Sequence, residues 1–160
     1  MDAVRAYIAI GGNLGDRYKT LRAAVDRLDE SAGVRVRRVS TFIETDPVGG
    51  PARQGRYLNA AAEIETTLSP EHLLETLQQI EAEMGRNRTT EPRWGARTCD
   101  LDILLYDDRV VDEPGLTIPH PRMHQRLFVI EPLAEIAPHA IHPVLKQSVQ
   151  QILQALHGRN

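Results

Sequence analysis

The order of hydrophobic periods along the chain restricts its fold more than any other feature of the sequence. An extended run at 5–10 ends at two glycines, and apolar residues then recur at helical spacing over 18–28, after Asp16 as a possible N-cap. Two further extended runs, 34–44 and 57–66, are separated by a stretch rich in proline and glycine. The pattern predicts a strand, a helix and two more strands.

A second helix and a fourth strand follow. Ser69, Pro70 and Glu71 supply a capping hydroxyl, a proline suited to the first turn and an acid at the positive end of the helix dipole. Gly85 is expected to end this helix, and 100–106 is predicted to be a strand. The buried stripe of this second helix is formed by Leu73, Leu77, Ile80 and Met84.

The resulting order, β-α-β-β-α-β, is typical of a ferredoxin-like α+β sandwich with both helices on one sheet face. The last third of the chain is less regular and provides additional C-terminal elements. It ends in a helix with Val149, Ile152, Leu153 and Leu156 on one side. We expect a single domain over residues 1–160, with its site on the sheet face away from the two main helices.

Composition and charge narrow the possible partners. A net charge of −3 gives no general attraction for nucleic acid or an anionic membrane. The one cysteine, Cys99, excludes an internal disulfide, and the N-terminal residues lack the apolar core of a signal peptide. No apolar stretch reaches the roughly 18 residues that suggest a membrane span. We therefore expect a soluble, cytoplasmic protein that binds neither nucleic acid nor membrane.

Two carboxylates lie on one face of the fourth strand. Alternation directs Asp100 and Asp102 to one side and Leu101 to the other. Just upstream, four arginines surround Trp94 and Gly95. A guanidinium group can bind phosphate in a bidentate manner, with two parallel hydrogen bonds to its oxygens. Carboxylates that hold Mg²⁺ beside these arginines would bind a polyphosphate. The alternative is a set of surface ion pairs, which contribute about 0 to 1 kcal/mol each. The arginines are Arg86, Arg88, Arg93 and Arg97.

Other motifs carry weaker functional signals. The turn 11–15 fits neither a P-loop nor a dinucleotide-binding pattern, so we interpret it as a tight βα turn. His120 and His124 have helical metal-ligand spacing but no accompanying Glu or Cys, which disfavours zinc. His120 could instead donate a hydrogen bond to a phosphate. Cys99 is expected in the core. Tyr57 and Asn59 share a strand face and could stack on and hydrogen-bond a flat heterocycle, although an ordinary half-buried strand is the better explanation of this pair taken alone.

Five segments in order resemble the 6-hydroxymethyl-7,8-dihydropterin pyrophosphokinase family. They cover nearly the whole chain, and the Arg-Trp-Gly segment that leads into Asp-Leu-Asp is highly specific. The resemblance implies transfer of pyrophosphate from ATP to the hydroxymethyl group of the pterin, in folate synthesis. It also implies a monomer. The segments are AYIAIGGNLGD, ETDPVG, YLN, RWGARTCDLDIL and IPHPRM, which begin at Ala6, Glu44, Tyr57, Arg93 and Ile118.

The resemblance also implies roles for individual residues. Asp100 and Asp102 would bind two Mg²⁺ ions with ATP, and Arg86 and Arg97 would act catalytically on the phosphates. The ATP site would comprise Gln78, Glu81, Arg86, Arg88, Trp94, Arg97, Ile103, Thr117, His120 and Arg126. The pterin site would comprise Thr45, Val48, Tyr57, Asn59, Trp94, Asp100 and Phe128.

Some positions depart from the family pattern. Ala96 stands where proline is common, Cys99 where a larger aliphatic residue is usual, and Gly55-Arg56 where a proline or an acid precedes the tyrosine. These differences bear on loop conformation. Two other functions remain as alternatives: a two-metal phosphohydrolase, which uses the same residue types, and an RNA-binding module, which shares the β-α-β-β-α-β order. The RNA alternative lacks an aromatic RNP1-like run, and aromatic content is only 4%.

Overall fold

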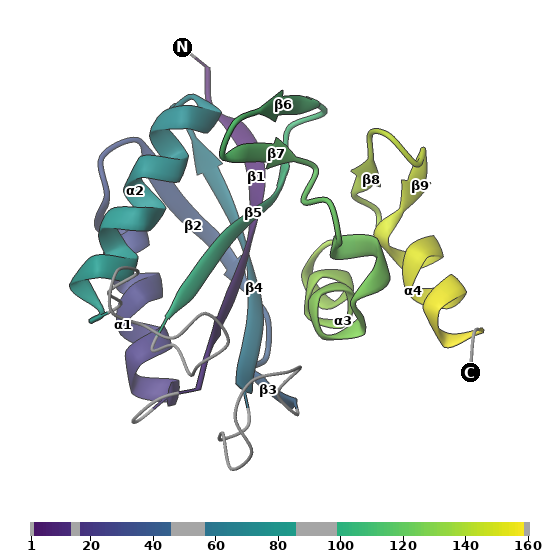
Figure 1. Ribbon diagram of the computed structural model, residues 1–160, viewed down its shortest axis with the longest axis horizontal. Coiled ribbons are helices and arrows are strands. Elements are labelled where there is room, and N and C mark those ends of the chain that lie inside the picture. Colours follow the sequence, from purple (N-terminus) through teal and green to yellow (C-terminus); the bar gives the residue numbers. More distant parts are fainter. Residues whose placement is uncertain (1, 14–16, 46–56, 86–98, 159–160) are drawn as a thin grey trace.

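The computed structural model describes residues 2–13, 17–45, 57–85 and 99–158, and within these ranges the chain is organised around an antiparallel five-stranded sheet. The sheet order is β2-β4-β1-β5, with β3 also paired to β4, so β1 and β4 lie at the centre (Figure 1). All of its pairings are antiparallel. The strands are β1 (Val4–Gly12), β2 (Val34–Val39), β3 (Ile43–Thr45), β4 (Tyr57–Thr66) and β5 (Asp100–Tyr106).

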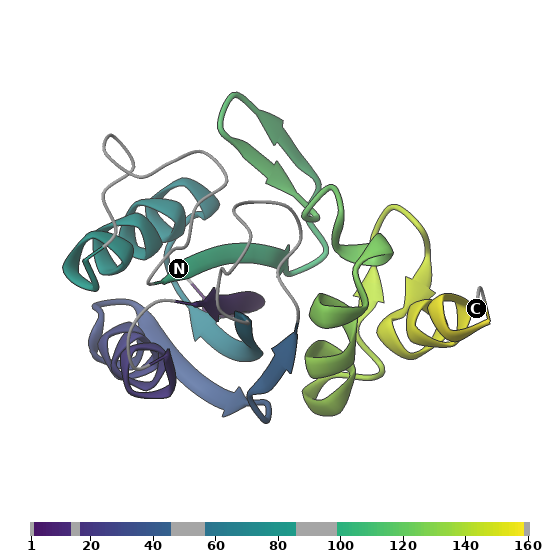
Figure 2. The ribbon, with the colours of Figure 1, turned by 60° about the horizontal axis from the view of Figure 1, so that its bottom comes forward.

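Two helices, α1 (Arg17–Glu30) and α2 (Pro70–Glu83), cover one face of the sheet (Figure 2). Alternate side chains of the strands reach this layer and are fully buried there, which follows from the period of two along a strand. Burial of this apolar surface is the main contribution to the stability of the fold. The strand residues in this layer include Ile8, Ile10, Ala60, Ala62, Ile64, Leu101 and Ile103.

The helix predicted after Ser69 is confirmed at both ends. The Ser69 hydroxyl accepts a hydrogen bond from the His72 backbone N–H at 3.2 Å, which satisfies a donor that the first turn cannot pair. Gly85 follows the helix with φ of +95°, a conformation that favours glycine. The strands predicted at 57–66 and 100–106 are also confirmed.

The other sheet face is partly covered by α3 (Leu127–Ile136), and α4 (Val149–His157) packs on the outside of α3 (Figure 1). The predicted C-terminal helix is therefore confirmed, but α3 was not predicted. It contains Pro132 and lacks a side-chain cap at its start, so it gives a weak helical signal.

The remaining described elements are the hairpin of β6 (Val111–Glu113) and β7 (Leu116–Ile118), the 3₁₀ helix η1 (Met123–Gln125), and the hairpin of β8 (Ile141–His142) and β9 (Gln147–Ser148). No helix within the described ranges is long and apolar enough to cross a membrane.

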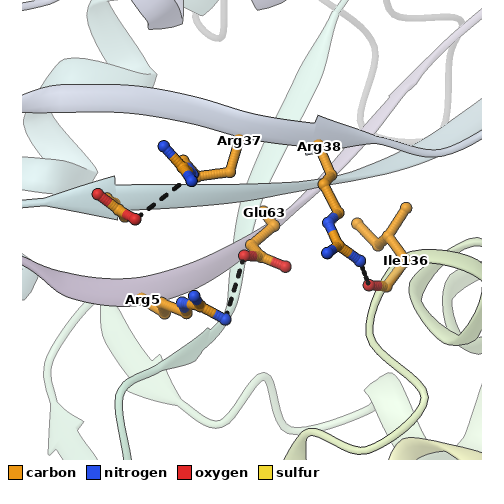
Figure 3. Close-up of polar contacts among 6 residues, drawn as sticks. Arg5, Arg37, Arg38, Glu63 and Ile136 are labelled. Atoms are coloured by element: carbon orange, nitrogen blue, oxygen red, sulfur yellow. Dashed lines mark hydrogen bonds and ion pairs between the residues drawn. The ribbon is translucent and has the colours of Figure 1, made fainter.

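Polar contacts tie the C-terminal end of α3 to β2 and the segment after it. Arg38 of β2 donates to the Ile136 carbonyl at 3.3 Å, so a cation lies at the negative end of the helix dipole (Figure 3). The Glu135 carboxylate accepts the Thr41 backbone N–H at 2.8 Å. Together with the packing of Leu133 and Ile130 in the apolar layer, these contacts fix α3 against the sheet.

Two predicted strand boundaries are wrong. The run 34–44 is two strands rather than one, because Ser40 interrupts it and exchanges hydrogen bonds with Ala61: its N–H donates to the Ala61 carbonyl, and its hydroxyl accepts the Ala61 N–H, both at 2.9 Å. Gly11 and Gly12 continue β1 and pair with β4, instead of forming a turn after it.

A β-bulge divides β5 between Ile103 and Leu105. The register with β1 shifts between Tyr7 and Ile8, which leaves Leu104 as the extra residue. As a result Leu104 and Leu105 both pack in the α3 layer, while Tyr106 turns to the α2 side and its hydroxyl donates to the Leu68 carbonyl. Before the bulge, strict alternation is kept.

Candidate active site

Two strands, β4 and β5, place polar side chains at either end of one cross-strand row on the sheet face away from α1 and α2, with a glycine of β1 between them. Gly11 of β1 pairs with Asn59 of β4 on one side and with Asp100 of β5 on the other. Asp102 lies in the adjacent row, opposite Ala9. Neighbouring strands are about 4.8 Å apart, so Asn59 and Asp100 lie roughly two strand spacings apart with a glycine between them. The predicted carboxylate face is therefore continuous with the face that carries Asn59.

The segment that leads into α3 supplies the second wall of a pocket over this row. The pocket has a volume of about 70 Å³, which fits the floor of a substrate site and not a whole nucleotide. It brings together six of the residues assigned to the site from the sequence. These are Asn59, Asp100, Asp102, His120, Arg126 and Phe128, with Ala9, Ile10, Gly11, Ala60, Leu104 and Val129 as further lining residues.

His120 is held in a defined orientation at this wall. Its Nδ1 accepts the Arg122 backbone N–H at 3.2 Å, so in the neutral ring Nε2 carries the proton and is a donor. Burial, followed by the nearby Arg126 guanidinium, lowers the pKa of His120 from its ordinary value of 6.5, and Asp100 opposes this shift. At neutral pH the ring is therefore an uncharged hydrogen-bond donor, suited to a phosphate oxygen.

The side-chain amide of Asn59 is also fixed. Its Nδ2 donates to the Thr45 hydroxyl at 2.7 Å, which leaves Oδ1 as the end of the amide on the Gly11 side. Tyr57 lies on the same strand face, two residues away. Across the pocket, the Arg126 guanidinium lies over the Phe128 ring at 5.7 Å from its centroid. Three of the residues assigned to the pterin, Thr45, Tyr57 and Asn59, thus come together on two paired strands.

Other residues assigned to ATP lie away from this pocket. Gln78 is exposed on α2, Thr117 is exposed on the β6–β7 hairpin, and Ile103 is buried in the layer beneath the helices. Glu81 is buried on α2 and accepts the Leu101 backbone N–H at 2.8 Å. Its carboxylate therefore supports β5 from the side opposite the pocket. Five further residues, Val48, Arg86, Arg88, Trp94 and Arg97, lie outside the described residues.

His120 and His124, which have helical metal-ligand spacing in the sequence, lie in different surroundings in the structure. His124 lies on η1 and makes an edge-to-face contact with His142 of β8, with ring centroids 6.2 Å apart, while His120 lines the pocket. Within the described ranges no group of three His, Cys, Asp or Glu residues could enclose a metal ion. Cys99 is fully buried, as expected from the sequence.

His142 is expected to make the stability of the C-terminal hairpin depend on pH. It is only 5% exposed, and its Nδ1 accepts the backbone N–H groups of Val144 and Leu145 at 3.3 and 3.1 Å. Burial and the neighbouring His124 lower the pKa of His142 below 6.5. In the unfolded chain the imidazole takes up a proton at higher pH, so the free energy of unfolding should fall as pH decreases below about 6.5.

Urea denaturation at pH 7.5 and pH 5.5 measures this effect. The His142→Gln variant should show a smaller pH dependence than the wild-type chain, whereas His139→Gln, at an exposed position, should retain it. An unchanged pH dependence in His142→Gln would show that this ring does not titrate below its unfolded value.

A larger cleft of about 550 Å³ lies between α1 and α2, on the opposite face. It contains none of the residues in the cross-strand row. Arg27 and Glu83, which line it, form an ion pair with each other. Charged groups that neutralise one another on a helical surface do not converge on a ligand, so the smaller pocket is the better candidate site.

Gly11 was missed as a site residue in the sequence analysis. Its signal was available, since a glycine at the end of a strand permits close approach of another group, but we assigned it to a turn. Leu104 was also missed, because its position facing the pocket depends on the bulge in β5. Neither residue carries a reactive group, so a search for chemistry alone does not find them.

The fold and the pocket define a class of protein, and comparison with known proteins then defines the family. Carboxylates, a neutral histidine and an arginine on an open sheet face suit a transferase that acts on a phosphorylated substrate. A family model described as 7,8-dihydro-6-hydroxymethylpterin-pyrophosphokinase matches residues 7–138. The chain belongs to this family. Membership assigns it pyrophosphoryl transfer from ATP to hydroxymethyldihydropterin, in folate biosynthesis.

Two bacterial relatives are each described as 2-amino-4-hydroxy-6-hydroxymethyldihydropteridine pyrophosphokinase. The protein of Bacillus subtilis is 55% identical over 131 residues, which cover 82% of this chain and 77% of that protein. The protein of Haemophilus influenzae is 46% identical over 140 residues, which cover 88% and 86%.

A solved structure has the same fold at much lower identity. The wild-type HPPK-DHPS of Plasmodium falciparum superposes with a TM-score of 0.77 at 14% identity, and the match covers 98% of this chain. It covers 45% of that longer chain, so the present chain spans less than half of its length. The mixed α/β architecture with an antiparallel sheet is therefore that of these proteins.

Proposed function

We propose that the pyrophosphoryl transfer takes place over the row formed by Asn59, Gly11 and Asp100. The observation that carries this proposal is the register of β4, β1 and β5, which aligns an amide suited to a heterocycle with a carboxylate suited to a metal. The pterin would bind at the Asn59 end, between Tyr57 and Phe128, with its hydroxymethyl group directed toward Asp100. The nucleotide triphosphate would lie on the other side of Asp100.

The donor set fits Mg²⁺. This ion is usually held by one or two carboxylates and completes its coordination with water and substrate phosphates, so Asp100 and Asp102 on one strand face are sufficient protein ligands. When bound with ATP, two such ions would neutralise the phosphate charge and lower the pKa of the attacking hydroxyl. Asp100 would bind metal beside the pterin, and Asp102 would bind it two residues further along β5.

His120 and Arg126 would bind the phosphates from the opposite wall. The neutral His120 ring donates through Nε2, and the Arg126 guanidinium offers several N–H groups to phosphate oxygens. Thr45 would act through Asn59, because its hydroxyl fixes which end of the amide faces the pocket. Arg86 and Arg97 are proposed to stabilise charge on the transferring group, with Arg88 and Trp94 at the nucleotide and Val48 at the pterin, as the sequence resemblance implies.

Binding of RNA on this sheet face is disfavoured by its chemistry. An RNA-binding module of this strand order would present aromatic side chains here, whereas β5 presents Asp100 and Asp102.

We also propose the ferredoxin-like sandwich as the fold class, supported by the sheet order in which β4 separates β1 from β2. A single domain over 1–160, a monomeric state and a cytoplasmic location complete the proposal.

The proposed reaction is tested by determining which phosphate bond of ATP is cleaved. With ATP labelled separately at the β- and γ-phosphates, both labels should appear in the pterin product, and AMP should form in equal amount. This is expected because the pterin oxygen attacks the β-phosphorus and both outer phosphates leave AMP together. Recovery of ADP with only the γ label transferred would exclude pyrophosphoryl transfer, and phosphate released without pterin would indicate the hydrolase.

A further inference from the structure

Gly11 occupies a position where a glycine costs stability without a conformational need. A glycine inside a strand destabilises it by about 0.5–1 kcal/mol relative to alanine. Unlike Gly33, Gly85 and Gly115, whose φ angles are +79°, +95° and +79°, Gly11 does not have a positive φ. Its backbone conformation would therefore accept a side chain. The reason for a glycine must lie in what surrounds it.

The surroundings leave little room for a methyl group on the side of Asn59. A Cβ on Gly11 would lie 3.0 Å from Asn59 Oδ1, 3.6 Å from the Leu58 carbonyl oxygen and 4.0 Å from Asn59 Cγ. The closest of these contacts is tighter than an ordinary van der Waals contact, and it involves the amide that the pterin site uses. The amide cannot easily move away, because Nδ2 is hydrogen-bonded to Thr45 Oγ1 at 2.7 Å.

We propose that Gly11 is a positioning and specificity residue of the pterin site, acting through Asn59. Without a side chain, it lets the Asn59 amide keep Oδ1 next to Gly11 in the lining of the pocket. It also leaves a bare floor between Asn59 and Asp100, across which the pterin edge and its hydroxymethyl group can lie close to the sheet. This inference rests on the proposed function, because it requires that Asn59 binds the pterin.

The Gly11→Ala variant tests the proposal. Its dissociation constant and KM for the reduced pterin should rise about tenfold, because a displaced amide leaves buried polar partners unmatched. We expect kcat at saturating pterin, and the affinity for a MgATP analogue, to change less than threefold. Calorimetry and steady-state kinetics measure these values. A pterin affinity within twofold of wild type would overturn the proposal.

A double-mutant cycle with Asn59→Ala separates this role from a general structural effect. Once the amide is absent, Gly11→Ala should cause no further loss of pterin affinity, since the methyl group then has nothing to displace. Additive losses would overturn the action through Asn59. If Asn59→Ala alone leaves pterin affinity unchanged, the proposed pterin site fails; if only Gly11→Ala is without effect, the proposed site stands and the role of Gly11 fails.

The proposal also remains testable if Gly11→Ala does not fold. The double variant Gly11→Ala/Asn59→Ser has a shorter side chain at position 59, which relieves the 3.0 Å contact. It should recover the thermal midpoint of Asn59→Ser alone. An unfolded double variant would show that the strand itself excludes the methyl group, and this would overturn the proposal.

Discussion

Replacing either Asp100 or Asp102 with asparagine should lower kcat by about a thousandfold, the loss expected when a principal electrostatic group is removed from a reaction site. Each change removes one anionic ligand from the strand face that lines the pocket while keeping the side chain nearly isosteric. Both residues are half-buried on the open face, so the thermal midpoint of the ligand-free protein should change little.

Product formation at several Mg²⁺ concentrations measures this effect. Asp112→Asn, at an exposed position of β6, is the matched control and should retain wild-type kcat. If Asp100→Asn or Asp102→Asn kept near-normal kcat at ordinary Mg²⁺ concentrations, carboxylate-bound metal would not be part of the reaction. If kcat instead returned to the wild-type value at a much higher Mg²⁺ concentration, the affected residue would contribute to metal affinity alone.

The parts of the fold that depend on local sequence were predictable. The alternation of Asp100, Leu101 and Asp102 gives the two faces of β5 directly, because side-chain direction in a strand has a period of two. The start of α2 was predictable for a similar reason, since a capping hydroxyl and a proline act within one turn. Such signals need no knowledge of the tertiary structure.

Features set by tertiary contacts were not predictable. Helix α3 is stabilised by packing on β4 and by polar contacts to Arg38 and Thr41, which are far away in the sequence. Its own residues include Pro132 and give little capping signal. The register that aligns Gly11 with both Asn59 and Asp100 is likewise a property of three paired strands. Six of the residues that line the pocket could therefore be named from the sequence, but their relative geometry could not.

Glu81 illustrates how a site residue assigned by resemblance can have a different structural environment. Its carboxylate is 2% exposed and accepts the Leu101 N–H at 2.8 Å. Leu101 lies between the two aspartates, and β5 is an edge strand whose outward N–H groups need acceptors beyond β1. The family resemblance assigns Glu81 to the nucleotide site; in the structure its carboxylate is hydrogen-bonded to the strand that carries Asp100 and Asp102.

Glu81→Ala should therefore lower the free energy of unfolding by about 2–3 kcal/mol, because it leaves a buried N–H without its charged acceptor and creates a cavity. It should also lower kcat, since the end of β5 that carries Asp100 loses its support from α2. Glu81→Gln retains a side-chain carbonyl for Leu101 and should lose less than half as much stability. Denaturant unfolding and steady-state kinetics of both variants, with Glu75→Ala at an exposed position of α2 as control, measure these effects. If both Glu81 variants instead raised the KM for ATP equally at unchanged stability, Glu81 would contact the nucleotide and not support the strand.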